Sequence, residues 1–234
     1  MFWGCFAYDK KGPCHIWKDE TAAEKLAYKT ELDRRNALRV KSDKAKWNKE
    51  QKKAAITYKR KYSRAKPGKT ATWVHNEKNG TYIRIKGTGG IDWWRYQQTI
   101  HIPKLFPFVK KCIRSRPKTV IQEDKAPSCA SHYQDEILNL WKLTKLLWCG
   151  NSPDINAIEP TWNWMKRQTT IHGSFTSKIK IEEAWLQCWK DLPQKTIQKW
   201  IERIPIHVKE IIRLEGGNQY KEGRLKGIEK KTVH

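Results

Sequence analysis

Residues 18–66 contain neither glycine nor proline, the two residues that most readily interrupt regular secondary structure. The stretch is dense in Lys, Arg, Glu, Ala and Gln, and it stops at Pro67 and Gly68. This composition predicts one or two long helices. The apolar residues are too sparse for a continuous stripe, so we expect the segment to project into solvent or to lie on a partner.

The same region carries almost half of the positive charge. The chain has 48 Lys/Arg and 24 Asp/Glu, which gives a net charge of +24. Residues 18–71 contain 18 Lys/Arg and 7 Asp/Glu, a net charge of +11 (18 − 7). The electric field of this positive charge favours binding to a polyanion, because every phosphate that the protein neutralises releases counterions. Solvated faces on long helices would give the same count, so both interpretations stay open. The candidate nucleic-acid contacts in this region are Lys52, Lys53, Arg60 and Lys61.

The cysteines and histidines indicate a reducing compartment rather than a zinc site or a disulfide framework. The six cysteines include no C-x-x-C pair, and the histidines lack ligand spacing to any cysteine. No apolar run approaches the roughly 18 residues of a membrane span, and the first residues lack a signal peptide. We therefore expect an intracellular protein, in the nucleus or the cytoplasm, that is neither secreted nor membrane-bound.

Turn signals and apolar spacing predict the elements on either side of the basic segment. Residues 1–17 are typical of a β-hairpin, and a second hairpin is expected over 72–86 around Asn79 and Gly80. Pro103 and Pro107 should bend a helical segment over 91–112. Further elements are expected as strands at 119–122 and 144–148 and as helices at 133–141, from Glu159 to about Arg167, 178–191 and 194–214. Trp185 and Trp189, four residues apart, are expected in the core.

Two acidic motifs carry the chemistry. Residues 120–128 read Val-Ile-Gln-Glu-Asp-Lys-Ala-Pro-Ser, a hydrophobic strand that ends at Asp124, and residues 150–162 place Glu159 in the first turns of a helix. Taken singly, such an Asp is usually a turn residue and such a Glu is usually solvated. Asp154, just before the helix, is interpreted as its cap.

Both motifs together, with 34 residues between Asp124 and Glu159, closely resemble the DDE transposases of the Tc-one/mariner superfamily. Those enzymes carry Gln-x-Asp-x-Ala-Pro at a strand end and Ser-Pro-Asp-Leu-Asn-x-Ile-Glu later in the chain. The segment from Phe2 to Cys5 also fits the family's second core strand. The resemblance covers residues 1–17 and about 92–214, and the basic insertion lies outside it.

The resemblance implies an α/β fold: a ribonuclease-H-like mixed sheet flanked by helices, lacking its first strand, with a long basic helical insertion. The expected domains are a core over 1–17 and 92–214, an insertion with a short hairpin over 18–91, and a flexible tail over 215–234. The implied activity is metal-dependent DNA cleavage and strand transfer, in which Asp124 and Glu159 hold Mg²⁺ or Mn²⁺ in a two-metal site. DNA is the expected partner, without a small-molecule substrate, and a homo-oligomer stays open.

The chain departs from the family at several positions. The family's first catalytic Asp lies upstream of the Trp-Gly strand and has no counterpart here, so we expect an N-terminally truncated core with impaired or absent catalysis. Lys125 replaces the family's Asn or Gly beside Asp124, where its ammonium group could compete with a cation or contact a phosphate. Cys129 stands where the family usually has His. The alternatives are a non-catalytic nucleic-acid-binding module and an inert transposon remnant.

Overall fold

A computed structural model describes residues 1–68, 72–74, 81–84, 90–124, 126–148, 152–171, 173, 175 and 177–215. The chain divides into two compact units. One combines Met1–Trp17 with Ile91–His234, and the other is Lys18–Gly90. The turn of the predicted second hairpin, most of the glycine joint after it and residues 216–234 lie outside the described residues. The described parts of that hairpin, 72–74 and 81–84, contain no strand.

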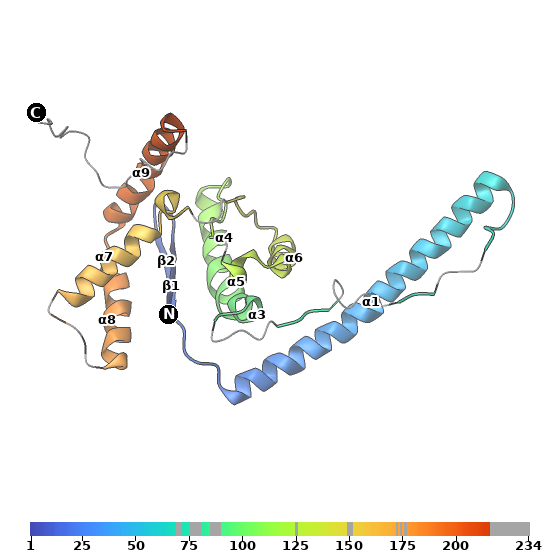
Figure 1. Cartoon of the computed structure of the whole chain (residues 1–234), viewed down its shortest axis with the longest axis horizontal. Coiled ribbons are helices and arrows are strands. Elements are labelled where there is room, and N and C mark those ends of the chain that lie inside the picture. The colour runs from blue at the N-terminus through green and yellow to red at the C-terminus, as the bar shows by residue number, and fades with distance from the viewer. Residues whose placement is uncertain are drawn as a thin grey trace, which may run out of the picture. The chain divides into compact units, whose positions relative to one another are not determined.

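The basic segment forms a single helix, α1 (Ala22–Tyr62), of 41 residues (Figure 1). At 1.5 Å per residue it is about 60 Å long. Thr21 begins it with a capping box, in which its hydroxyl accepts from the Glu24 backbone and the Glu24 carboxylate accepts from the Thr21 backbone. Ser63 ends it in the left-handed conformation, φ 55°. The predicted long helix is therefore confirmed.

Residues 81–84 lie along the first half of α1. The Asn36 amide pairs with the backbone of Tyr82, accepting from its N–H at 2.7 Å and donating to its carbonyl at 3.1 Å. Arg84 forms two hydrogen bonds with the Glu20 carboxylate, at 2.9 and 3.1 Å. Leu32 is the buried side chain of α1, so polar contacts rather than a hydrophobic core hold this part of the helix.

The predicted first hairpin is confirmed as an antiparallel pair, β1 (Phe2–Phe6) and β2 (Lys11–Ile16). Side chains alternate between its two faces, as the period of a strand requires. Trp3 and Cys5 pack against one hydrophobic cluster, and Phe2 and Phe6 pack against another. The hairpin thus lies between two small cores.

The first core is formed around three consecutive helical elements, α3 (Trp93–Tyr96), η1 (Gln97–Leu105) and α4 (Phe106–Ser115). Its buried residues are Trp17, Tyr96, Ile100, Leu105, Phe106, Val109, Ile121, Cys129, Leu138 and Leu143. The middle part, η1, is a π-helix that contains Pro103, so the irregularity expected from the prolines is present.

The second core joins α7 (Glu159–Thr170), α8 (Lys178–Asp191) and α9 (Gln194–Arg213). Its buried residues are Met165, Cys188, Trp189, Leu192 and Ile197, with Trp185 packed against them. The predictions of these helices and of a core role for Trp185 and Trp189 are confirmed.

The two strands predicted at 119–122 and 144–148 are reduced to one parallel bridge between Ile121 and Lys145. The segment cannot extend further because turns close it on both sides. Thr119 bonds back to the Arg116 carbonyl, and the Asp124 carboxylate accepts from the Ala126 N–H. The short helices α5 (Pro127–Ala130), α6 (His132–Trp141) and η2 (Pro153–Ile155) complete the unit.

The described residues form a mostly helical α/β protein with a small two-stranded sheet. The five described cysteines are free thiols. In the described part of the chain, no helix has both the length and the apolar character needed to cross a membrane.

Candidate functional site

Asp124 lies in a short segment, three residues after Ile121, the residue that is bridged to Lys145. Ile121 is 4% exposed and anchors this segment in the first core, whereas Asp124 is exposed. The Oδ1 atom of Asp124 accepts a hydrogen bond from the Ala126 N–H at 3.1 Å. This bond holds the carboxylate in a fixed direction at the end of the segment.

Glu159 is the first residue of α7 and is half-buried. Asn156 connects it to the Asp124 segment. The Asn156 amide donates to Glu159 Oε1 at 3.4 Å, and its oxygen accepts from the Gln122 amide at 3.5 Å. These long, weak bonds link the end of the extended segment to the start of the helix.

The two predicted carboxylates come within electrostatic range of each other. Burial raises the pKa of Glu159, and the Asp124 carboxylate raises it further. A like charge has this effect only when it is close, because water screens distant charges. The fold therefore brings together two residues that are separated by 34 others in the sequence.

These side chains suit a hard divalent cation. Mg²⁺ and Mn²⁺ prefer oxygen ligands, which Asp124 and Glu159 supply. Their mutual repulsion would be relieved by a positive ion between them. Within the described residues, no cluster of three or more His, Cys, Asp or Glu side chains has the geometry of a metal site. Asp124 and Glu159 can thus supply two carboxylate ligands to a cation.

The other candidate residues are placed as follows. Lys52, Lys53, Arg60 and Lys61 are exposed on α1, in the unit that does not contain the carboxylate pair. Lys125 lies outside the described residues.

The interpretation of Asp154 as a helix cap is wrong. It lies within η2, whereas α7 begins five residues later with Ile158 as its N-cap. A proline-containing 3₁₀ turn therefore separates Asp154 from the helix. Its backbone carbonyl instead accepts a hydrogen bond from His207 at 2.8 Å.

A buried polar network includes the residue immediately before Asp124, and this network was not predicted from the sequence. Its centre is Glu123, whose side chain is only 8% exposed. The Tyr96 hydroxyl donates to Glu123 Oε1 at 2.7 Å, and His101 Nε2 lies 3.0 Å from the same oxygen. Lys145 Nζ is 3.0 Å from Oε2, as an ion pair that lacks hydrogen-bond geometry.

His101 lies between two hydrogen-bond partners. The Gln134 amide group donates to the carbonyls of Trp93 and Ser128, which turns its oxygen towards His101 Nδ1 at 3.0 Å. Both ring nitrogens of His101 therefore face oxygen atoms. Burial by itself would raise the pKa of Glu123, but His101, Lys145 and Tyr96 outweigh it and lower the pKa to about 2. Glu123 is thus ionised at neutral pH.

The sequence contained one signal for this network. Glu123 and Asp124 are consecutive at the end of an extended segment, so their side chains must point to opposite sides. If Asp124 faces solvent, Glu123 faces the core, where a carboxylate needs partners. The identity of those partners depends on α3 and η1, which the sequence pattern did not connect to this segment.

Comparisons with known proteins point to transposases. No protein-family model matches the sequence. The chain is similar to the transposable element Tc3 transposase of Caenorhabditis elegans, 26% identical over 103 residues, which is 44% of this chain and 31% of that protein. It is also similar to the transposable element Tcb1 transposase of Caenorhabditis briggsae, 29% identical over 98 residues, 42% of this chain and 35% of that protein. The matches thus span about a third of each of these relatives.

Among solved structures, the chain is similar to the Mos1 mariner paired end complex with Mn. The TM-score is 0.46 with 15% sequence identity, and the match covers 68% of this chain and 51% of the other.

Proposed function

We propose that this chain, which is related to the Tc-one/mariner transposases, contributes to DNA transposition by metal-dependent phosphoryl transfer at Asp124 and Glu159. The observation that carries the proposal is that Asn156 joins the two motifs, because its amide donates to Glu159 Oε1 and its oxygen accepts from the Gln122 amide, two residues before Asp124. Their motifs are the ones that resemble the family. A ribonuclease-H-like core over residues 1–17 and 92–214 and a nuclear location are part of the same proposal.

The chain's own residues would hold the cation and keep its ligands in place. Asp124 and Glu159 would bind Mg²⁺ or Mn²⁺, which supplies an activated oxygen nucleophile and neutralises charge on the phosphate. Ala126 orients the Asp124 carboxylate, and Asn156 contacts that of Glu159. The Glu123 network anchors the segment that carries Asp124.

We further propose that cleavage by this chain is weak. Two carboxylates define one cation position, whereas the two-metal mechanism needs ligands for both the attacking and the leaving oxygen. The Asp124→Asn and Glu159→Gln variants should then remove whatever activity is present, because each leaves a single carboxylate.

Strand cleavage provides the test. The full chain is incubated with end-labelled DNA and Mn²⁺, Mg²⁺ or EDTA. Nicking is expected with Mn²⁺ or Mg²⁺ only, and it should be lost in Asp124→Asn and Glu159→Gln. Asp154→Asn is the matched control, because Asp154 lies in the same loop region but interacts through its backbone carbonyl. DNA binding without cleavage by the wild-type chain would support a binding module instead, and the absence of both would support an inert remnant.

Metal binding gives a second readout that does not depend on activity. Bound Mn²⁺ is detected by its enhancement of water-proton relaxation. The Mn²⁺ affinity of either carboxylate variant should be at least about tenfold lower than that of the wild type, because even the loss of a partner of a metal ligand costs about tenfold. Asp154→Asn should match the wild type. Equal Mn²⁺ affinity in all four proteins would rule out the proposed site.

A further inference from the structure

The two halves of α1 differ in their charge. The first half is contacted by residues 81–84 through Asn36 and carries acidic as well as basic residues. Beyond Glu50, residues 51–68 contain no Asp or Glu. The same stretch has seven basic residues, namely Lys52, Lys53, Lys59, Arg60, Lys61, Arg64 and Lys66. We call residues 52–66 the basic end of α1.

Two tyrosines lie within this basic end. The rings of Tyr58 and Tyr62 have centroids 4.5 Å apart and are tilted by 40°. Lys61 Nζ lies 5.2 Å from the centre of the Tyr62 ring, within cation–π range. Tyr62 is 48% exposed, so part of the aromatic surface faces solvent.

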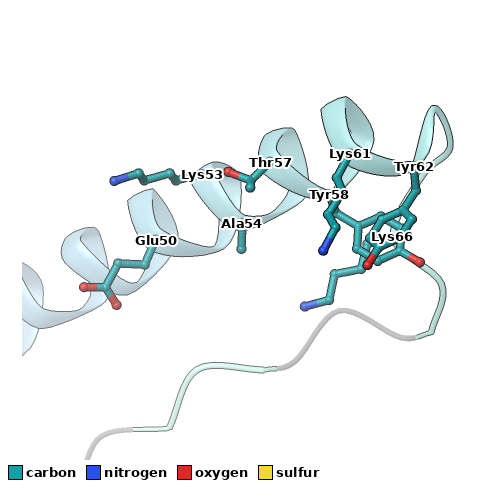
Figure 2. Close-up of a pocket in the computed structure, with 8 residues that line it drawn as sticks. All are labelled: Glu50, Lys53, Ala54, Thr57, Tyr58, Lys61, Tyr62 and Lys66. Atoms are coloured by element: carbon teal, nitrogen blue, oxygen red, sulfur yellow. The ribbon is translucent and has the colours of Figure 1, made fainter.

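The tyrosines and lysines line one shallow groove of about 550 Å³. Figure 2 shows the Tyr58 and Tyr62 rings beside the Lys66 side chain, where the chain leaves α1. Lys53 and Lys61 also line the groove. The aromatic surface thus shares the groove with Lys53, Lys61 and Lys66, and Glu50 is the acidic residue among the lining side chains.

Helix stability does not account for this arrangement. Basic residues in a last helical turn interact favourably with the helix dipole, but that effect is limited to the final turn. Lys52 and Lys53 lie more than two turns before the end of α1, and Lys66 lies beyond it. The helix dipole therefore does not account for these three lysines.

We infer that the basic end of α1 binds single-stranded nucleic acid, with an unpaired base stacked on the Tyr58–Tyr62 pair and the lysines on the phosphates. Aromatic rings next to cations are the usual means of binding single strands without sequence preference. A duplex would satisfy the lysines but not the tyrosines, because its bases are already stacked on one another. This surface does not involve Asp124 or Glu159.

The test measures fluorescence anisotropy of labelled 20-nucleotide strands with the full chain in EDTA, so that failure of the metal site cannot affect it. A normal DNA strand is compared with an abasic strand that has the same phosphates. The wild type should bind the normal strand at least about tenfold more tightly, as one stacked base predicts. An RNA strand of the same sequence shows which nucleic acid is preferred.

The Tyr58→Leu/Tyr62→Leu variant isolates the stacking contribution. Leucine keeps the helix propensity and removes the aromatic rings. This variant should bind normal and abasic strands with the same affinity, and circular dichroism should show unchanged helicity. If it keeps the wild-type preference for the normal strand, the tyrosines do not stack on bases and the inference is wrong.

A triple variant, Lys53→Gln/Lys61→Gln/Lys66→Gln, isolates the phosphate contacts. It should bind at least about tenfold more weakly and reduce the slope of log Kd against log salt by about 2, because each phosphate contact on a single strand contributes about 0.7. The matched control, Lys25→Gln/Lys29→Gln/Lys41→Gln, removes the same charge from exposed positions of the first half. Equal losses in both variants would mean that general charge, and not this surface, binds the strand.

Discussion

At the residue scale, Glu123 and Asp124 are adjacent acidic residues in opposite environments. Glu123 is buried and surrounded by Tyr96, His101 and Lys145, whereas Asp124 is exposed near Glu159. The alternation of side chains in an extended segment produces this difference. One carboxylate therefore belongs to a buried polar network, and the other is accessible to solvent.

Replacing Glu123 by glutamine should lower the free energy of unfolding by about 3–5 kcal/mol, because it leaves the Lys145 ammonium group without its anion. Urea denaturation at pH 7 measures this. Glu183→Gln, at an exposed position of α8, is the control and should change stability by less than about 0.5 kcal/mol. Similar effects of the two substitutions would contradict the role assigned to the network.

The stability difference between wild type and Glu123→Gln should also depend on pH. The pKa of Glu123 is about 2 in the folded protein, against an ordinary value of 4.5. A carboxyl group with a lowered folded pKa stabilises the protein above its unfolded pKa, and this contribution is lost as pH falls towards the folded value. The stability difference between wild type and Glu123→Gln should therefore be constant above about pH 5 and shrink between about pH 4.5 and 2. A constant difference down to pH 3 would exclude this linkage.

Asp124→Asn should lower the pKa of Glu159, since it removes the neighbouring charge that raises it. A carbon-detected NMR titration of the Glu159 carboxyl group in metal-free protein measures the shift. Because a raised pKa means that the ionised Glu159 destabilises the fold at neutral pH, the variant should also gain stability, by less than about 1 kcal/mol given partial exposure. An unchanged titration would show that the two carboxylates do not interact.

At the element scale, the hairpin depends on a close approach between β1 and α8. A Cβ atom on Gly4 would lie 2.6 Å from the Trp189 ring, too close for any real contact. The Trp189 indole N–H also donates to the Gly12 carbonyl at 3.1 Å, so the ring is held over the hairpin. Glycine at position 4 is therefore a packing requirement.

Gly4→Ala should destabilise the protein by about 1–3 kcal/mol, because Trp189 or the strand must move to accommodate the methyl group. Thermal unfolding followed by near-UV circular dichroism would detect it, since Trp189 is part of the second core. Gly90→Ala is the control, as nothing lies within 4 Å of a Cβ atom there. A Gly4→Ala variant as stable as Gly90→Ala would mean that this contact is loose in solution.

At the scale of the whole molecule, net charge dominates the expected interactions. The chain carries +24, and α1 contributes +9 of it (14 basic − 5 acidic residues). An excess of this size should attract any phosphate polymer, whatever its sequence.

Binding to duplex DNA of arbitrary sequence should therefore weaken at least about tenfold between 50 and 200 mM salt, with a linear plot of log Kd against log salt. Filter binding in EDTA measures this. Two duplexes of unrelated sequence should give the same slope. A salt-independent affinity would exclude electrostatic binding by the chain as a whole.

Local sequence determined much of this structure. The absence of glycine and proline from 18 to 66 determined α1, alternation determined the hairpin, and helical spacing determined α8 and α9. The motif spacing singled out Asp124 and Glu159 as a pair. The helices and the hairpin depend on residues close in sequence, so pattern alone sufficed for them.

Tertiary structure alone decided the environment of the candidate site. It reduced two expected strands to the bridge at Ile121 and Lys145, and it assigned His101 and Tyr96 from a distant helical segment to Glu123. It also placed Asp154 in a short turn instead of at a cap. Burial, and hence the charge state of a buried group, is a sum over neighbours from the whole fold, and no local pattern of residues contains that sum.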